Sequence, residues 1–380
     1  MKGSRLFRWV DRLAGITLMV ILRVAGVFLP VSVRNGRDIL VVKFSAMGDT
    51  VLLLPVIRRL KAGLPGRRLV ALGTFANRAA LEASPDIDEV VLFEPGMAFN
   101  PVRLVAFIRG LRARRFALAV DFDQWLRISP VLCFLSGAPR RAGFATKGQF
   151  RHLLYTDPVP RAPRRHELDL FYDILAGVGV GAAVSERSTF FPAGPDAKAE
   201  AAKLLREAGV TGRYAAIHPG CGAKGWRRQW PEEKYAELVK WLKSKGLAVL
   251  VSTGPGEEPL FEAIRRLSGA ELVQVAGRAL PVLASIMEGA SVFVSGNTGV
   301  MHLAAAAGAP VVALHGPTDA GRWGPVGKRC VSISSRHPGS PCLDLGFEYR
   351  CKDPGRKCME AIGTAEVIAA VEAILANGGN

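Results

Sequence analysis

A single carboxylate, Asp49, stands where one apolar run of the sequence ends and the next begins. The run before it, residues 39–42, holds only Ile, Leu and Val, and the residues in between include Ser, Ala and Gly. This order is typical of a buried strand, a tight loop and a helix. A carboxylate at the start of that helix can act as a general base when a reactive hydroxyl lies within reach, or it can serve only as a cap. The local sequence leaves both roles open.

A second segment with chemical potential is 296–302, which reads Gly-Asn-Thr-Gly-Val-Met-His. Its glycines let a ligand approach the backbone closely, and the helix that follows directs free amides and its positive dipole end toward an anion. Thr298 adds a hydroxyl, and His302 lies one turn into the helix. The segment matches neither the dinucleotide fingerprint nor the phosphate loop G-x-x-x-x-G-K-[ST]. A phosphate site and a plain Asn/Thr cap with a core-facing His both fit the pattern.

A third candidate is the cation Arg228, which precedes Trp230-Pro231 at the start of a predicted helix. A guanidinium there can hold a diphosphate and offset the charge of a departing nucleotide. The alternative is a solvated basic loop.

These residues need elements to position them, and the sequence predicts strands that alternate with helices in both halves. The expected strands are residues 41–44, 70–72, 89–93 and 117–120, then 214–217, 247–252, 271–275, 291–294 and 311–314. Such alternation favours parallel sheets with helical crossovers. Parallel strands end on one edge of a sheet, where ligands bind, and two such domains facing each other would form a cleft.

The length of 380 residues predicts two domains. The stretch 145–195 interrupts the alternation and is rich in Pro, Gly and Arg, so we interpret it as containing the linker. We expect an N-terminal segment over 1–37, a first domain over 38–190 and a second over 191–360. A last helix within 361–380 is expected to pack back toward the first domain.

The charge balance predicts an anionic partner. The chain has 50 Lys+Arg against 33 Asp+Glu, a net charge of +17. Nucleic acid, anionic lipid and a phosphorylated substrate all fit that surplus, and so does a solvated basic surface. Nucleic acid is the least favoured of these partners, because the basic residues are not interleaved with aromatic side chains that would stack on bases.

The N-terminal run 13–33 carries one charge, Arg23, and basic residues flank it on both sides. This pattern favours a helix that lies in the interface of an anionic membrane. A single spanning helix comes second, since an Arg at its centre is costly, and an ordinary core helix third.

Six cysteines are present, and three of them, Cys342, Cys351 and Cys358, lie close together in the sequence. Their spacing does not match a standard zinc site, so we predict that no metal is bound.

Five motifs in fixed order carry a resemblance to a known family. They are Lys43-x-Ser45-x-x-Gly48-Asp49 with Pro55, His218-Pro219-Gly220, Arg228-x-Trp230-Pro231, Asn297-Thr298-Gly299-x-x-His302 and Gly316-Pro317-Thr318-Asp319. Together, over residues 38–375, they resemble the ADP-heptose:lipopolysaccharide heptosyltransferases of glycosyltransferase family 9. The resemblance implies an α/β protein of the GT-B fold, in which two Rossmann-like parallel-sheet domains face each other across a cleft. The N-terminal amphipathic helix would precede them.

The resemblance implies an inverting, metal-independent and cofactor-free transfer of a heptose from ADP-L-glycero-D-manno-heptose to the lipopolysaccharide inner core. Asp49 matches the family's candidate general base, which would deprotonate the acceptor hydroxyl. Asn297 stands where many members have Asp, so a charge is missing beside the donor sugar. The donor-binding roles carry over to Arg228, Glu257, Asn297, Thr298, Gly299 and His302.

Acceptor binding is implied for the first domain. Lys43, Asp121 and Gln124 match family positions, and the basic residues Arg164, Arg165 and His166 are candidate contacts for phosphates or carboxylates on the lipid core. For the two arginines, a solvated basic face is the alternative. The expected partners are an ADP-sugar, a lipid A–core oligosaccharide and the anionic surface of the inner membrane, with the enzyme peripheral or monotopic on the cytoplasmic face.

Other functions remain as alternatives. A transferase of the same family with another nucleotide-sugar or another surface-glycan acceptor fits the Asn297 difference. A basic nucleic-acid-binding protein is the alternative from another class. A dinucleotide-dependent oxidoreductase is disfavoured, because no strand is followed by G-x-G-x-x-G and a later acid for the ribose.

Overall fold

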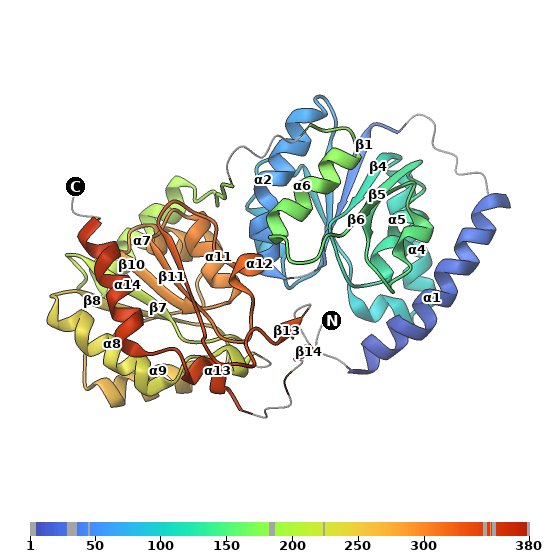
Figure 1. Cartoon of the computed structure of the whole chain (residues 1–380). Helices are drawn as coiled ribbons and strands as arrows, with labels where there is room; N and C mark the ends of the chain where they lie inside the picture. Colours follow the sequence, from blue (N-terminus) through green and yellow to red (C-terminus); the bar gives the residue numbers. More distant parts are fainter. Residues whose placement is uncertain are drawn as a thin grey trace. The chain divides into compact units, whose positions relative to one another are not determined.

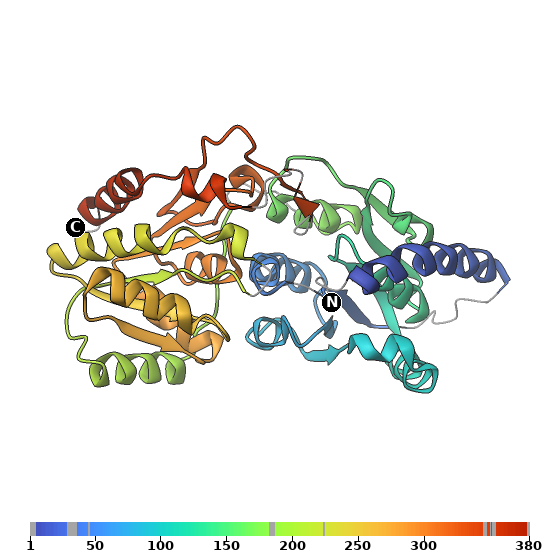
Figure 2. The ribbon, with the colours of Figure 1, turned by 90° about the horizontal axis from the view of Figure 1, so that it is seen from below.

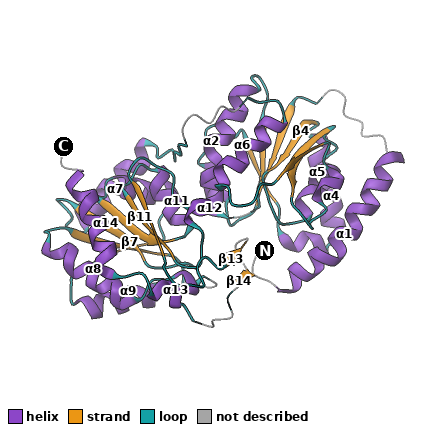
Figure 3. Ribbon diagram, viewed as in Figure 1, coloured by secondary structure: helices purple, strands orange, loops and turns teal. Residues whose placement is uncertain are grey.

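The computed structural model describes residues 5–28, 36–44, 46–181, 187–222, 225–344, 348–349, 351 and 355–377. The chain divides into two compact units, Met1–Glu186 and Arg187–Asn380 (Figure 1), whereas we expected the boundary at 190/191. Each unit contains a parallel sheet with helices packed on it (Figure 3). The prediction of two Rossmann-like parallel-sheet domains is therefore confirmed.

The sheet of the first unit has six parallel strands in the order β3-β2-β1-β4-β5-β6. They are β1 (Asp38–Val42), β2 (Leu69–Gly73), β3 (Glu89–Leu92), β4 (Phe116–Asp121), β5 (Arg140–Ala145) and β6 (Asp157–Pro160). The central strands are buried almost throughout, because helices cover both faces of the sheet. The strand order reverses between β1 and β4, so the switch point of this sheet lies beside the loop that carries Asp49.

Helices pack on both faces of this first sheet (Figures 1 and 2). The pair α2 and α6 contact each other on one face, and α5 lies on the other face between α1 and α4. Their bounds are α1 (Arg5–Phe28), α2 (Met47–Gly63), α3 (Arg78–Glu82), α4 (Pro101–Ala113), α5 (Ile128–Leu135) and α6 (Glu167–Gly177), with short 3-10 turns η1 (Pro95–Phe99) and η2 (Arg151–Leu154).

The second unit repeats the same topology. Its six-stranded parallel sheet has the order β12-β11-β10-β7-β8-β9, with the switch point between β7 and β10. The strands are β7 (Tyr214–His218), β8 (Ala248–Thr253), β9 (Val273–Ala276), β10 (Val292–Gly296), β11 (Val311–His315) and β12 (Cys330–Ser334). A short antiparallel pair, β13 (Leu343–Asp344) and β14 (Glu348–Tyr349), follows them.

Nine helical segments complete the second unit. They are α7 (Pro195–Glu207), η3 (Trp226–Arg228), α8 (Glu232–Ser244), α9 (Glu258–Ser268), α10 (Leu280–Glu288), α11 (Gly299–Ala306), α12 (Ala320–Trp323), α13 (Lys357–Glu360) and α14 (Thr364–Asn377), among the described residues. The last helix buries Val367, Val371 and Ile374 in the core of this same unit, against α8. The expected packing of residues 361–380 toward the first domain stays a prediction.

The linker is shorter than the stretch 145–195 in which we expected it. Strand β6 and helix α6 lie within that stretch and belong to the first unit. The prolines of β6 hid the strand, because Pro within a sheet is largely confined to edge strands, and β6 is one of the two edge strands of this sheet.

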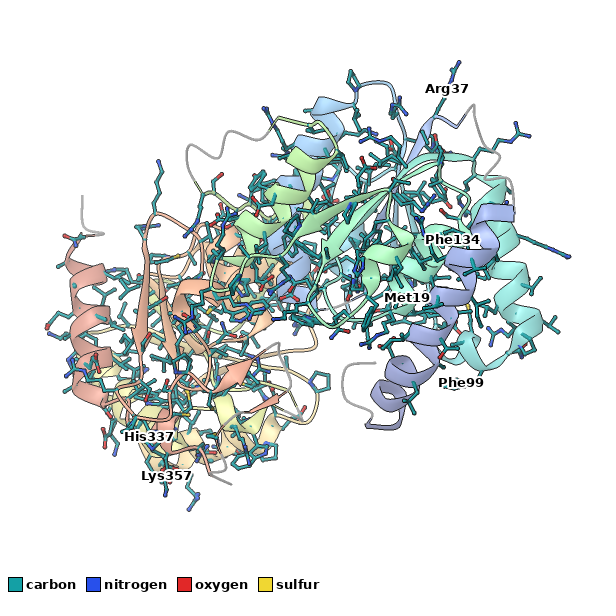
Figure 4. All side chains as sticks on the ribbon, turned by 45° about the vertical axis from the view of Figure 1, so that its right-hand side comes forward. Met19, Arg37, Phe99, Phe134, His337 and Lys357 are labelled. Carbon is teal, nitrogen blue, oxygen red and sulfur yellow. The ribbon has the colours of Figure 1, made fainter. Side chains whose placement is uncertain are left out.

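The N-terminal helix α1 is attached to the first unit through α5 and η2. Its Met19 is fully buried in a small cluster with Val131 and Leu154. Phe134 of α5 packs against the same cluster, and Figure 4 labels both Met19 and Phe134. Among the helices in the described part of the chain, none is both long enough and apolar enough to cross a bilayer.

Candidate functional site

The second unit gathers the loops that follow β7, β8, β10 and β11 at one edge of its sheet. These strands are parallel neighbours, so their carboxyl ends emerge together. Open parallel sheets bind ligands at this edge, beside the switch point. The expected donor residues all lie in these loops or at the helix starts that follow them.

The loop after β10 places Thr298 at the N-cap of α11. Its hydroxyl accepts a hydrogen bond from the Met301 amide at 3.3 Å, and Gly299 is the first residue of the helix. His302 is buried one turn further on. The cap interpretation is thus correct for Thr298, and the capped helix start also directs its remaining amides out of the sheet edge.

Arg228 joins the loops on the two sides of the switch point. Its Nη1 donates to the Asn297 carbonyl at 3.0 Å, and its Nη2 lies 3.4 Å from the Cys221 carbonyl. Both acceptors are uncharged, so these contacts position the guanidinium without neutralising it. A Cβ added to Gly296 would lie 2.6 Å from the Arg228 carbonyl, and only Gly allows this approach.

Glu257 holds the loops after β7 and β8 together. Its Oε1 accepts from the Gly222 amide and its Oε2 from the Gly254 amide, each at 2.8 Å. His218 lies beside it, with Nε2 4.0 Å from Oε2. Burial lowers the pKa of His218, and its Nδ1 donates to the Ser252 carbonyl at 2.9 Å. Glu257 therefore organises the edge through the backbone, a role the sequence pattern did not indicate.

Asn297 uses its amide group inside the unit. Its Nδ2 donates to the Trp323 carbonyl at 2.9 Å, which ties the loop after β10 to α12. An Asp at this position would have no donor for that carbonyl. The next loop is held by His315, whose Nδ1 lies 3.0 Å from the Thr318 hydroxyl. Burial lowers the pKa of His315 to about 4.

The first unit has a different edge, and Asp49 lies on it in the first turn of α2. The Asp49 carboxylate accepts from the Ala46 amide at 3.3 Å and lies 3.5 Å from Lys43 Nζ. Asp49 is 14% exposed and Lys43 only 2%. Lys43 also lies 5.5 Å from the centre of the Phe171 ring. Asp49 is therefore both a helix cap and a fixed, accessible carboxylate beside a buried cation; Ser45 of the same motif lies outside the described residues.

Asp123, which sequence reasoning missed, joins the two strands of this switch point. Its Oδ2 accepts from the Phe44 amide after β1 at 3.3 Å, and its Oδ1 accepts from the Trp125 amide at 3.1 Å. The signal in the sequence was a second acid directly after β4, close to Asp121.

Asp121 does not face a ligand, and its predicted acceptor contact is wrong. The side chain is fully buried and accepts from Arg151 at 2.8 Å and from the Tyr155 hydroxyl at 2.7 Å. Burial raises the pKa of Asp121 to about 6, against the opposing pull of the buried Arg151 guanidinium. Arg151 also donates to the Leu126 and Asp123 carbonyls. The cluster is internal support for the loop after β4.

Gln124 is also enclosed, so its direct acceptor contact is a second correction. Its amide contacts the Glu167 carboxylate, and only 1% of Gln124 is exposed. Glu167 in turn accepts from Arg161 at 2.7 Å. The Arg161 guanidinium lies 5.2 Å from the ring centre of the half-buried Trp125. These contacts join the loops after β4 and β6 and the start of α6.

The remaining acceptor candidates separate into one cap and two exposed cations. His166 is buried and caps α6, accepting from the Leu168 amide at 3.2 Å. Arg164 is exposed with a positive φ of 61°. Arg165 is also exposed and pairs with Asp173 at 2.6 Å. Exposure leaves both arginines able to meet an anionic ligand.

Two of the cysteines near the C-terminus, Cys342 and Cys351, lie close together. All six thiols are free, and the Cys351 thiol lies 3.2 Å from the Cys342 sulfur. Within the part of the chain that the structure describes, no three or more His, Cys, Asp or Glu side chains are grouped to hold a metal ion.

Comparison with solved structures supports the fold. A glycosyltransferase family 9 protein from Veillonella parvula superposes with a TM-score of 0.75 at 19% identity, covering 90% of this chain and 97% of that one. An E. coli heptosyltransferase solved with ADP gives a TM-score of 0.67 at 21% identity, covering 89% and 99%.

Sequence comparison gives the family. Lipopolysaccharide heptosyltransferase 3 of Escherichia coli is 24% identical over 345 residues, which covers 86% of this chain and 96% of the relative. The model of glycosyltransferase family 9 (heptosyltransferase) matches residues 104–351, more than half of the chain. The chain therefore belongs to glycosyltransferase family 9, the heptosyltransferase family, and is a glycosyltransferase.

Proposed function

We propose that the protein transfers a heptose from ADP-L-glycero-D-manno-heptose to the inner core of lipopolysaccharide, with inversion and without a metal. The observation that carries the proposal is the edge of the second unit, where Arg228 lies between two loops next to the amides that begin α11. That arrangement suits a diphosphate. Similar proteins are named as lipopolysaccharide heptosyltransferases, and one was solved with ADP-2-deoxy-2-fluoro heptose.

Arg228 and the start of α11 would share the negative charge of the donor. The guanidinium balances the charge that grows on the leaving ADP, while the amides from Gly299 onward bind phosphate oxygens. Thr298 fixes the first turn of the helix, and His302 supplies a polar group one turn behind it. Glu257 keeps the neighbouring glycine loops in place, and any ribose contact would use its remaining lone pairs.

Asp49 would act as the general base. A hydroxyl of the acceptor loses its proton to the Asp49 carboxylate, its oxygen bonds to the anomeric carbon, and the bond from that carbon to the phosphate oxygen breaks. ADP leaves from the opposite face, so the anomeric configuration inverts. The Lys43 ammonium at 3.5 Å holds the carboxylate in position, which is the role we propose in place of acceptor binding.

The acceptor is a phosphorylated lipid A–core, and Arg164 and Arg165 are the exposed cations we propose for its anionic groups. We propose that His166 acts only by positioning this loop through its cap on α6. Because lipid A anchors the acceptor, we place the enzyme on the cytoplasmic face of the inner membrane, as a peripheral or monotopic protein.

One observation keeps a second candidate, a transferase of the same family with another nucleotide-sugar or another surface-glycan acceptor. Asn297 donates to the Trp323 carbonyl and carries no charge, so it offers the donor sugar a different contact from Asp.

A donor screen tests both candidates. Purified protein is incubated with a heptose-deficient lipopolysaccharide and, separately, ADP-heptose, UDP-sugars and GDP-sugars, and nucleotide release is measured. We expect acceptor-dependent release of ADP from ADP-heptose. Release only from UDP- or GDP-sugars would overturn the main proposal and support the second candidate.

A further inference from the structure

Large apolar side chains are exposed mainly on one part of the first unit. Of the twelve such side chains in the described part of the chain, eight lie on α1, η1 and α4. They are Leu13, Leu18, Val20, Ile21 and Val24 on α1, and Phe99, Val102 and Val105 on η1 and α4. Single exposed apolar residues are ordinary, but a cluster of this kind marks an interaction surface.

The outward direction of the α1 residues is fixed by how that helix is attached. Asp11 accepts from the Arg127 amide at 2.9 Å and from its guanidinium at 3.1 Å, in a nearly buried ion pair. A Cβ added to Gly15 would lie 2.9 Å from the Arg127 side chain, so the helix lies close to α5. With Met19 buried on the same side, Ile21 and Val24 on the other side are more than half exposed, at 56% and 57%.

The α4 residues are held in the same way. Leu104, Phe107 and Ile108 pack into the core of the first unit, which leaves Val102 and Val105 on the outer side of α4. Ile128 of α5 packs against both this core and the α1 cluster. Helices α1 and α4 therefore flank α5 on one face of the sheet (Figures 1 and 2), and Phe99 lies at the end of η1 beside them (Figure 4).

The sequences of α1 and α4 carry mainly positive charge. The sequence of α1 contains four arginines and one acid, Asp11, which Arg127 already pairs. The sequence of α4 contains Arg103, Arg109 and Arg112 and no acid. Apolar residues mixed with arginine are typical of helices at an anionic membrane surface.

We propose that the outer faces of α1 and of η1–α4 form one docking surface for an anionic lipid bilayer. The surface is built rigidly into the first unit, so it would set how that unit meets the membrane, rather than act as a loose tether. The physiological reason rests on the proposed function, whose acceptor is anchored in lipid.

Co-sedimentation of the full chain with phosphatidylcholine vesicles, with and without phosphatidylglycerol, tests the proposal. Two double variants, Ile21→Asp with Val24→Asp and Val102→Asp with Val105→Asp, each place acids on one helix. We expect each to weaken binding to the phosphatidylglycerol vesicles at least about tenfold, because every added acid is repelled by the anionic surface. Val331→Asp, at an exposed apolar residue of β12, is the matched control and should bind like the wild type.

Circular dichroism establishes that each variant is folded. If the α4 variant binds phosphatidylglycerol vesicles as well as the wild type does, α4 is not part of the docking surface. If the wild type does not bind them, the proposal is wrong. A change of oligomeric state in the α1 variant, without a change in lipid binding, would identify the face as a protein interface instead. Transfer of heptose to a lipid-free core oligosaccharide separates the two proposals: docking variants keep this activity, whereas a wild type that binds vesicles but transfers nothing contradicts only the proposed function.

Discussion

The two sheets have the same strand order and the same switch-point position, but the charged side chains at their ligand-binding edges make different contacts. At the first edge, side-chain charges meet in pairs, Lys43 with Asp49 and Arg161 with Glu167. At the second edge, a carboxylate and a guanidinium bind backbone groups of glycine-rich loops, as Glu257 and Arg228 do. One topology thus presents a carboxylate suited to proton transfer in one unit and a cationic, amide-rich site suited to an anion in the other.

The difference also appears in how each edge is supported. Behind the first edge lies the fully buried cluster of Asp121, Arg151 and Tyr155. Behind the second lie His218 and His315, neutral imidazoles whose pKa values burial lowers. We therefore expect substitutions at the first edge to affect proton transfer, and substitutions at the second edge to affect stability in acid.

The largest effect is expected from Asp49→Asn. The substitution keeps the size of the side chain and removes its basicity, so kcat should fall by about 10²–10⁴-fold. The measurement is steady-state ADP release with lipopolysaccharide acceptor. Asp38→Asn, an acid of the same unit at the start of β1, is the control and should keep normal turnover. If Asp49→Asn leaves kcat unchanged, Asp49 is not the general base.

Asp121→Asn should cost stability rather than chemistry. It leaves the buried Arg151 charge without its partner, which typically lowers the free energy of unfolding by about 3–5 kcal/mol. Chemical denaturation measures this change. The control Asp157→Asn breaks the exposed pair with Arg140 at 3.0 Å and should cost less than about 1 kcal/mol. Equal losses for the two variants would contradict the supporting role of the buried cluster.

The second unit should lose stability in acid through His315. Its folded pKa of about 4 lies below the ordinary value of 6.5, so the neutral imidazole stabilises the fold fully above pH 6.5. That contribution falls as the pH drops through the folded pKa, by about 3 kcal/mol in total. Denaturation curves between these pH values measure it. In His315→Asn the slope with pH should be shallower, and an unchanged slope would assign the acid sensitivity elsewhere.

Asn297→Asp should have a smaller effect. The carboxylate would face the Trp323 carbonyl without a donor, at a cost of about 1–3 kcal/mol to the loop between β10 and α12. Thermal melting gives the stability, and the donor KM shows whether the loop still binds nucleotide. If Asn297→Asp is as stable as the wild type and accepts the same donor, the amide is not what holds this loop.

Much of this comparison was predictable from sequence, because alternating apolar runs and glycine-rich loops are local patterns. Each strand expected from such a run is present. In the two six-stranded sheets, the strands that were missed are β5, β6 and β12. β6 and β12 are edge strands, where burial alternates or Pro occurs, whereas β5 is an inner strand whose sequence RRAGFA contains no long apolar run.

The site residues were predicted less evenly. Asp49, in the first turn of α2, and Arg228, in η3, each follow the carboxyl end of a strand, as their motifs indicated. Asp121 also ends a strand, but its side chain points into the unit, toward Arg151 and Tyr155, which come from a later part of the chain. The pattern of apolar and polar residues does not show whether an acid at the end of a strand points toward a ligand or into the core when its partners are distant in sequence. We therefore predicted a ligand contact for a residue that is buried.

The most direct test of the division between the two edges is equilibrium binding of ADP to three proteins by calorimetry: wild type, Asp49→Asn and Arg228→Gln. Arg228→Gln removes a charge-assisted contact and should weaken ADP binding by about 10–100-fold, with Arg228→Lys recovering part of the affinity. Asp49→Asn should bind ADP like the wild type. Loss of ADP affinity in Asp49→Asn, or wild-type affinity in Arg228→Gln, would contradict the account.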